Sequence, residues 1–254
     1  MAVNRNFADN YYIGGGELYV KIKGEENFRY FGQTESATVS FKVDKVEHQN
    51  SEGAILTTDL EVTKAVSAEI SIQTADLNPT TLALAFSGEY NEVKQASETG
   101  LEVDITGAAA GAVYELGKRK VKNVVVTYNN GEEDVNAVED VDYSVDYEFG
   151  TVEIAKDGAI VNKDIKVTFD NDSVTIGKFT SLNKTSQEVA LRFITKPLHG
   201  KPSKTDIFRV NLSLDGDFAL KSAEDIQKIT LKGKVLKDTN RPEGQQFLVK
   251  EVLA

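Results

Sequence analysis

The segment from Leu60 to Gln73 constrains the fold of this chain more than any other stretch of its sequence. Apolar and polar residues alternate along it, and only Lys64 interrupts the alternation. Strict alternation is typical of a β-strand that buries one face. At about 3.4 Å per residue this strand would span roughly 45–50 Å, about twice the usual length. We therefore expect a sheet whose far end needs a partner. The apolar face comprises Leu60, Val62, Val66, Ala68, Ile70 and Ile72, and the polar face comprises Glu61, Thr63, Ser67, Glu69, Ser71 and Gln73.

The composition fits a large soluble protein and gives no sign of a membrane segment. The chain has 254 residues, enough for one large β domain or two modest ones. Its longest purely apolar runs, such as 124–126, are too short to cross a bilayer. The N-terminal segment lacks the apolar stretch of a secretory signal, and the absence of cysteine excludes disulfides and thiolate chemistry. We expect synthesis in the cytoplasm and no membrane partner.

The net charge argues against nucleic-acid binding. The chain carries 40 acidic and 29 basic residues, a formal charge of −11, whereas a nucleic-acid binder carries a basic face. The basic cluster at 118–120, followed by Lys122, is interpreted as a solvated lead into a strand. An acidic surface would instead repel DNA.

Further alternation predicts an all-β fold of two packed antiparallel sheets, arranged as a sandwich or barrel. A strand at 37–43 forms a long hairpin with the strand described above. The polar segment Asp44–Asp59 between them is predicted to be a long loop. Other strands are predicted at 18–23, 101–105, 121–128, 143–150, 151–154, 165–169, 189–193, 208–214, 229–235 and 247–252, with a tight turn between 143–150 and 151–154.

One short helix is predicted over Pro79–Phe86, flanking the sheets. Asn78 is a favourable N-cap, and Pro79 suits the first helical position because its missing N–H is not needed there. Gly88 is a natural stop. A helix of two to three turns is marginal alone, so it must pack on a sheet.

The tract GAAAGA at 107–112 is predicted to mark a domain boundary. Residues 113–181 have a β pattern of their own, which fits an inserted subdomain or an extension of the main sheets. The main tube-like β domain would then comprise residues 1–112 and 182–254. Residues 1–16 would form an N-terminal arm that ends in three glycines.

No motif predicts catalysis, so we expect no catalytic, cofactor-binding or metal-binding residue and no enzyme activity. His48 and His199 fall in predicted loops, far apart in sequence. A triad would need partners brought together by the fold. The carboxylates at 140–148 lack the spacing of an EF-hand, and neither a nucleophile elbow nor a phosphate-binding loop is present.

Several segments occur in a characteristic order: Gly14–Lys21 (GGGELYVK), the hairpin at 37–73, the helix at 79–86, the block at 142–169, and the segment at 190–212. In this order they resemble the major tail protein, or tail tube protein, of long non-contractile-tailed bacteriophages. The resemblance covers most of the chain and depends on order more than on any single motif. It is weakest over 113–181.

The resemblance implies a structural virion protein. Such proteins form hexameric rings that stack into the tube through which DNA is ejected, and their fold is a pair of β-sheets flanked by a helix. Their long hairpin loop and terminal arm reach the neighbouring ring, which here would be Asp44–Asp59 and residues 1–16. The implied partners are other copies of the chain, the tape measure protein, the tail terminator and distal tail or baseplate proteins. DNA would pass without specific binding, and assembly would take place in the bacterial host cytoplasm before the protein resides in the virion tail.

The candidate functional residues all lie on the long hairpin. Polar-face carboxylates would repel DNA phosphates in the lumen and so prevent the tight contacts that would stall passage. The exposed edge of the long strand would pair with another copy. The lumen-facing candidates are Glu61, Glu69 and Gln73, and the inter-ring contact candidates are Lys45, Glu47, His48 and Glu52.

Three other classes stay open. Another tail component, such as a terminator or baseplate ring protein, would share the virion context. A carbohydrate-binding or adhesin β-sandwich would need aromatic platforms, and tryptophan is absent. An enzyme on a β scaffold could be a hydrolase that uses carboxylates alone.

Overall fold

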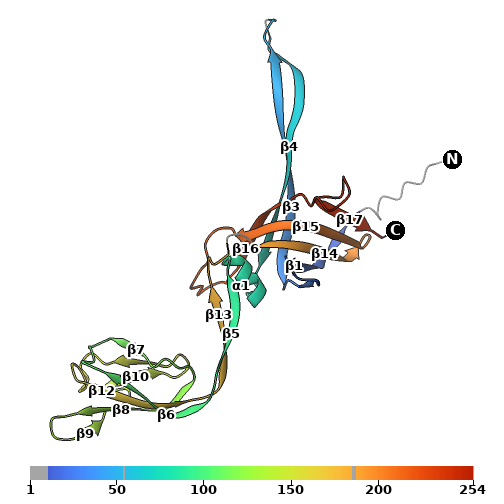
Figure 1. Ribbon diagram of the computed structural model, residues 1–254. Helices are drawn as coiled ribbons and strands as arrows, with labels where there is room; N and C mark the ends of the chain where they lie inside the picture. The colour runs from blue at the N-terminus through green and yellow to red at the C-terminus, as the bar shows by residue number, and fades with distance from the viewer. Residues whose placement is uncertain (1–10, 54, 185–186, 254) are drawn as a thin grey trace. The chain divides into compact units, whose positions relative to one another are not determined.

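The computed structural model describes residues 11–53, 55–184 and 187–253, and strands dominate this part of the chain. The predicted all-β fold with antiparallel sheets and one short helix is confirmed. The chain divides into two units (Figure 1). Unit one comprises the described residues up to Tyr90 and from Phe179 onward, and unit two comprises Asn91–Lys178.

A single eight-stranded antiparallel sheet forms the framework of unit one. Its strands follow the order β2-β1-β14-β15-β16-β4-β3, and β17 pairs with β15. Alternate residues of each strand form an apolar core on one face, while the opposite face is polar. The strands are β1 (Ile13–Ile22), β2 (Arg29–Tyr30), β3 (Thr34–Asn50), β4 (Thr57–Thr74), β14 (Glu188–His199), β15 (Ser203–Leu214), β16 (Ile229–Val235) and β17 (Leu248–Val252).

The two edges of this sheet approach each other at one end. β2 and β3 lie at opposite edges, yet only three residues, Phe31 to Gln33, separate them in sequence. A link of this length spans at most about 14 Å, so the sheet must curl around its core. Phe31 is completely buried at this link. Within the described residues β2 and β3 do not pair, and the curled sheet stays open.

Asn78 fastens this link to the helix. Its Oδ1 accepts hydrogen bonds from the backbone N–H groups of Thr80 and Thr81, each at 3.0 Å, which caps the helix as predicted. Its Nδ2 donates to the carbonyl oxygen of Phe31 at 2.8 Å. A Cβ on Gly32, whose φ is +118°, would lie 2.5 Å from that Nδ2. Only glycine fits this crossing.

Helix α1 (Pro79–Ala85) covers one end of the core face. The helix begins at Pro79 as predicted, and Phe86 forms its C-cap. It contacts β15 and β16, with Leu84 completely buried. The fully buried part of this core includes Leu18, Val20, Ile72, Leu191, Val210, Ile229 and Leu231.

Unit two is a small sandwich of two antiparallel sheets. One sheet has the order β6-β12-β8-β9 and the other has the order β10-β11-β7. Apolar residues from both sheets form one core, with Val126, Val152 and Val167 completely buried. The strands are β6 (Glu98–Ile105), β7 (Val113–Glu115), β8 (Val121–Asn129), β9 (Asp134–Asn136), β10 (Tyr143–Asp146), β11 (Thr151–Ile154) and β12 (Ile165–Asn171).

The second unit begins earlier than the predicted boundary at 113–181. β6 pairs along its length with β12, so residues 91–112 belong to unit two and not to the main domain. The predicted boundary tract, 107–112, lies inside unit two, where Ala108 is completely buried. β5 (Glu89–Gln95) and β13 (Val174–Thr180) pair with each other and carry the chain into and out of this unit.

Candidate assembly surface

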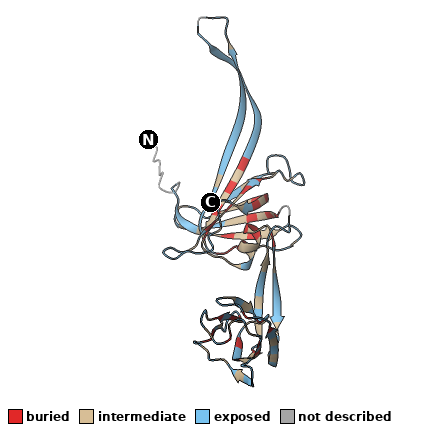
Figure 2. Ribbon diagram, turned by 90° about the vertical axis from the view of Figure 1, so that its left-hand side faces the viewer, coloured by how far each residue is buried: buried red, intermediate tan, exposed pale blue. Residues whose placement is uncertain are grey.

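The β3–β4 hairpin extends well beyond the sheet that anchors it. β16 pairs with β4 only along Ala68–Thr74, whereas β3 and β4 pair as far as Asn50 opposite Thr57. We call residues 42–53 and 55–67 the arm. All of them except the half-buried Asn50 are exposed, as the pale blue projection in Figure 2 shows.

The predicted long loop at Asp44–Asp59 is therefore wrong. β3 continues to Asn50 and β4 begins at Thr57, so the connection is confined to residues 51–56. A two-stranded ribbon in solvent buries neither face. Its sequence therefore does not need the alternation of apolar and polar residues by which strands are recognised. Its polar composition therefore resembles that of a loop.

Residues 1–10 of the predicted N-terminal arm lie outside the described residues. The three glycines expected to form a hinge belong to β1, because Gly14, Gly15 and Gly16 pair with β14. Gly16 also lies close to the Phe193 ring, where a side chain would collide.

A β-bulge at Lys64 reverses the faces of β4 along the arm. Asp44 pairs with Ala65, but Lys45 pairs with Thr63, so Lys64 has no counterpart on β3. An extra residue in one strand moves every later side chain of that strand to the other face. The interruption seen in the sequence at Lys64 is this bulge. The prediction that Leu60 to Ile72 present one continuous apolar face is wrong.

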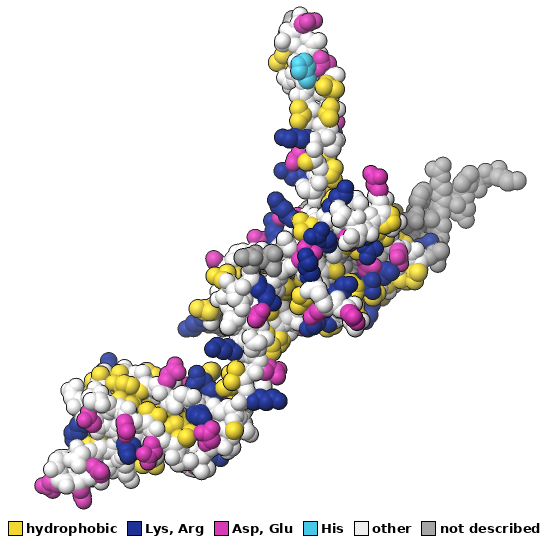
Figure 3. Space-filling view, viewed as in Figure 1, with side chains coloured by type: hydrophobic (Ala, Val, Ile, Leu, Met, Phe, Trp, Pro, Cys, Tyr) yellow, Lys and Arg dark blue, Asp and Glu magenta, His cyan; other side chains and the backbone are white. Residues whose placement is uncertain are grey.

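Exposed apolar side chains consequently lie on both faces of the arm. Val43 pairs with Val66 on the side that continues from the core. Beyond the bulge, Val46 pairs with Val62 on the opposite side. All four are about half exposed, and Phe41 at the base of the arm is 65% exposed. Figure 3 shows apolar side chains, in yellow, among charged ones on the visible side of the arm.

The three lumen candidates do not share one face. Glu69 pairs with Ser40 and Gln73 pairs with Ser36, both on the polar face of the sheet. Glu61 pairs with Glu47 beyond the bulge, which places it on the other face. A salt bridge of 2.5 Å between the Lys45 Nζ and the Glu61 Oε1 agrees with this register.

The inter-ring candidates all lie on the exposed arm. Lys45 and Glu47 lie on the face that continues from the core, and His48 lies on the opposite face with its Nδ1 2.6 Å from the Asp59 Oδ1. Glu52 is in the tip connection. Exposed polar contacts of this kind contribute little to stability. The structure describes no partner chain, so their contact with a neighbouring ring stays a prediction.

Salt bridges connect neighbouring strands on the polar face of the main sheet. Arg192 donates two hydrogen bonds to the Asp206 carboxylate, at 2.6 and 3.1 Å, across β14 and β15. Arg209 donates two to the Glu188 carboxylate, each at 2.8 Å. Such bidentate pairs are stronger than single hydrogen bonds. The hydrogen bonds from Arg209 lower the pKa of the Glu188 carboxyl, and those to Asp206 raise the pKa of the Arg192 guanidinium.

This face is mixed in charge and not an acidic wall. Glu69 lies 3.5 Å from the Lys232 Nζ, and Lys234 pairs with Glu69 across the neighbouring strands. Glu17 forms an ion pair with Lys196 near the other edge. Carboxylates on this face therefore have cationic neighbours, which weakens the repulsion of phosphates expected from the sequence.

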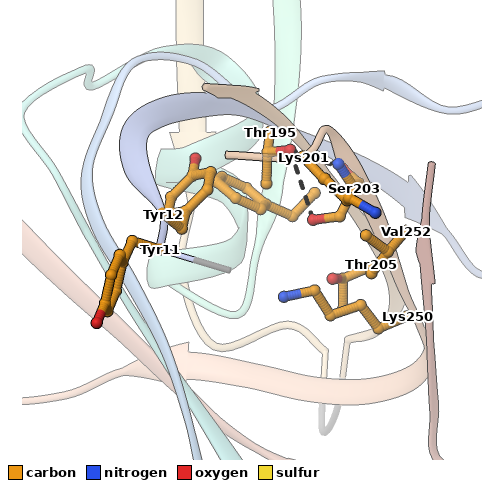
Figure 4. A pocket seen from close by; sticks show the side chains of 9 residues that line it. Tyr11, Tyr12, Thr195, Lys201, Ser203, Thr205, Lys250 and Val252 are labelled. Atoms are coloured by element: carbon orange, nitrogen blue, oxygen red, sulfur yellow. Dashed lines mark hydrogen bonds between the residues drawn. The ribbon is translucent and has the colours of Figure 1, made fainter. Parts of the chain in front are cut away.

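A pocket of about 350 Å³ opens on the core face near the ends of β14, β15 and β17 (Figure 4). Its wall includes Phe193, Thr205 and Lys250, which are consecutive cross-strand neighbours. Tyr12 and Val252 also line it. A smaller cavity of about 150 Å³ shares Phe193 and Thr205 and is otherwise lined by apolar core residues. The core of unit one is thus open to the surface at this end.

Sequence patterns did not reveal this pocket, because its residues come from four separate segments. The sequence does contain one signal of it. Thr205 and Lys250 are polar, yet the alternation of their strands places them on the face that carries the apolar core. Polar residues at strand positions that face the core indicate a place where the core is not covered.

The carboxylates considered for metal binding in unit two have structural roles. The two carboxylate oxygens of Asp142 accept hydrogen bonds from the backbone N–H groups of Ala159 and Val138, at 2.7 and 2.8 Å. Asp146 Oδ1 accepts from Glu148 and Phe149 N–H in a turn. In the described part of the chain no group of three or more His, Asp or Glu side chains is arranged to hold a metal ion. No described helix is long and apolar enough to cross a membrane.

The fold and the candidate surface define a class of two-unit, all-β proteins in which a curled sheet carries a long exposed hairpin. The chain belongs to the family described as "Protein of unknown function UCP028589", which matches residues 11–247. No curated protein matches the chain.

Proposed function

We propose that the chain is a structural subunit of a phage tail, the major tail protein whose copies form rings that stack into the tube for DNA. The tape measure, terminator and distal tail proteins would be its partners in the virion. The observation that carries the proposal is the arm. It exposes Val43, Val46, Val62 and Val66 to solvent on two faces, and among the described residues its strands pair only with each other.

Self-association accounts for such an arm better than a monomeric role does. An isolated two-stranded hairpin is marginally stable in water, and its outer edges carry unpaired backbone groups that pair readily with other chains. Contact with another copy would bury the apolar side chains of the hairpin and pair its edges, and both would stabilise it. A catalytic or ligand-binding monomer gains nothing from this exposure.

The polar face of the main sheet is the proposed lining of the tube. Its charges are tied in pairs such as Arg192–Asp206 and Arg209–Glu188. Paired side chains offer few free cations to DNA phosphates, so they limit the counterion-releasing contacts that would hold DNA in place. Glu69 and Gln73, which lie on this face, stay lumen candidates, whereas Glu61 on the arm becomes a candidate for contact between copies.

Negative-stain microscopy across a concentration series tests the proposal. The full chain is expected to form tubes or stacked rings with an open centre, above a critical concentration or on addition of isolated tail tips as nuclei. A variant in which residues 44–65 are replaced by an Asn-Gly turn should remain monomeric, because it keeps the pairing of Val43 with Val66 and lacks the rest of the arm. Single unstacked rings would instead favour a terminator or baseplate ring protein. A full chain that stays monomeric at all concentrations, with and without nuclei, would contradict the proposal.

A further inference from the structure

We propose that the pocket between β14, β15 and β17 receives the tip of the arm from a second copy of this chain. This inference rests on the proposed function and names the receiving site for the arm. The tip is represented by Glu52, Ile55 and Leu56, and the receiving pocket by Phe193, Lys201, Thr205, Lys250 and Val252.

The pocket has the properties of a core that another chain completes. α1 covers the core face at β15 and β16, whereas the described residues leave the end near Phe193 and Thr205 open as a pocket. The adjoining cavity reaches inward to Leu18, Val39 and Ile70. An apolar side chain that enters here would be removed from water on several sides, as in a domain core.

The rim of the pocket carries two lysines that form no salt bridge with the described residues. Neither Lys201 nor Lys250 forms an ion pair with a carboxylate in the described ranges, although most charged residues on the polar face do. Figure 4 shows both lysines among the side chains that line the pocket. An incoming segment with carboxylates beside apolar residues would match this rim.

The arm tip has this chemistry. Ile55 and Leu56 are 79% and 62% exposed, the kind of exposure that marks an interaction site when the residues are adjacent. Glu52 lies just before them, whereas the carboxylates of Asp59 and Glu61 in β4 already contact His48 and Lys45. Two aliphatic side chains fit within about 350 Å³, a volume at the lower end of that of ligand pockets.

The occupant must come from another copy, because the arm cannot fold back on its own pocket. Val39 lines the inner cavity, and β3 continues without a break from Val39 to Asn50. That stretch spans about 35 Å at 3.3 Å per residue. Its pairing with β4 is maintained to the end at Asn50 and Thr57, so the tip is held far from the pocket of its own chain.

Disulfide trapping in assembled material tests this inference directly, because the chain contains no cysteine of its own. The variant Leu56→Cys/Val252→Cys, assembled and then mildly oxidised, should give a ladder of linked chains on non-reducing gels. The matched control Leu56→Cys/Ser213→Cys places the second thiol on an exposed residue of the polar face and should give none. Tubes that form without a ladder from the Val252 pair would overturn the inference and leave the proposed function intact. Absence of tubes from the unmodified chain would instead count against the proposed function.

A charge exchange covers the case in which the cysteine variant fails to assemble. Lys250→Glu should raise the critical concentration for assembly about tenfold, the loss expected for a charged hydrogen bond at an interface. Combining it with Glu52→Lys should recover most of that loss. If Lys250→Glu assembles like the unmodified chain, the pocket is not the receiving site, and a small-molecule ligand becomes the better occupant.

Discussion

Val46 and Val62 face each other across the two strands of the arm, on the side opposite to the apolar stripe that leaves the core. The bulge at Lys64 produces this reversal, since it adds one residue to β4 and none to β3. The arm therefore presents one apolar pair on each face. A subunit with this arm is equipped to contact two different surfaces at once.

Inserting one residue between Asp44 and Lys45 should abolish assembly while leaving the subunit folded. The inserted residue gives Lys64 a counterpart on β3 and removes the bulge, so Val46 and Val62 move to the face that carries Val66, and the apolar pair on the opposite face is lost. We expect an unchanged circular dichroism spectrum and a thermal midpoint within a few degrees of the unmodified chain, with no tubes by electron microscopy. Lys64→Ala keeps the residue count and the bulge, so it should assemble normally. Tubes from the insertion variant would show that the reversal has no role.

Charged substitutions on the arm should affect assembly and not folding. Val62→Asp lies on an exposed ribbon, so the free energy of unfolding should change by no more than about 0.5 kcal/mol. Its critical concentration should rise at least about tenfold, because a charge would be buried between copies. The contrasting variant is Leu191→Ala, which removes a buried side chain and should cost about 2–5 kcal/mol. Denaturant unfolding and sedimentation velocity measure the two effects separately. Equal assembly by Val62→Asp would contradict an interface at this position.

Asn78→Ala should destabilise unit one by about 1–2 kcal/mol in denaturant unfolding, the range for loss of an N-cap. The substitution also removes the hydrogen bond from Nδ2 to the Phe31 carbonyl, which holds the link between the sheet edges. Asn78→Ser keeps an oxygen that can cap the helix and loses only the hydrogen bond to Phe31. The stability of this variant should therefore fall between that of the unmodified chain and that of Asn78→Ala. A serine variant no more stable than the alanine variant would show that the cap contributes nothing.

The helix and most strands were predictable because their signals are local. Asn78, Pro79 and Gly88 mark the helix within a few residues, and alternation marks the strands that bury one face. The bulge was visible as an interruption at Lys64, but its consequence depends on pairing with Asp44 and Lys45, which the sequence does not specify.

The remaining features depend on contacts between distant segments. The extent of unit two follows from the pairing of β6 with β12, more than 50 residues apart. The distal arm has no buried face, so no periodicity distinguishes it from a loop. The pocket combines residues as far apart as Tyr12 and Val252. Such features become apparent only when the register of the strands is known.

Glu188 should make unit one sensitive to acid. Its pKa is lowered by hydrogen bonds from Arg209, so the folded state favours the charged carboxylate. This stabilisation is present above the ordinary pKa of about 4.5 and is lost as the pH falls through the lowered folded value. The difference in unfolding free energy between the unmodified chain and Glu188→Gln should therefore be constant near neutral pH and shrink below pH 4.5. Urea unfolding between about pH 3 and 7 measures it. A difference that does not vary with pH would contradict the ion pair.

Hydrogen exchange of the arm, measured on monomeric and assembled protein, tests the central claim most directly. In the monomer, outward-facing amides of residues 42–50 and 57–67 should exchange rapidly, because only the partner strand protects the ribbon. In assembled protein the same amides should be protected by at least about a hundredfold, while the core amides of β8 stay unchanged. Arm amides that exchange at the same rate in both states would contradict the account, since the arm would then take no part in holding copies together.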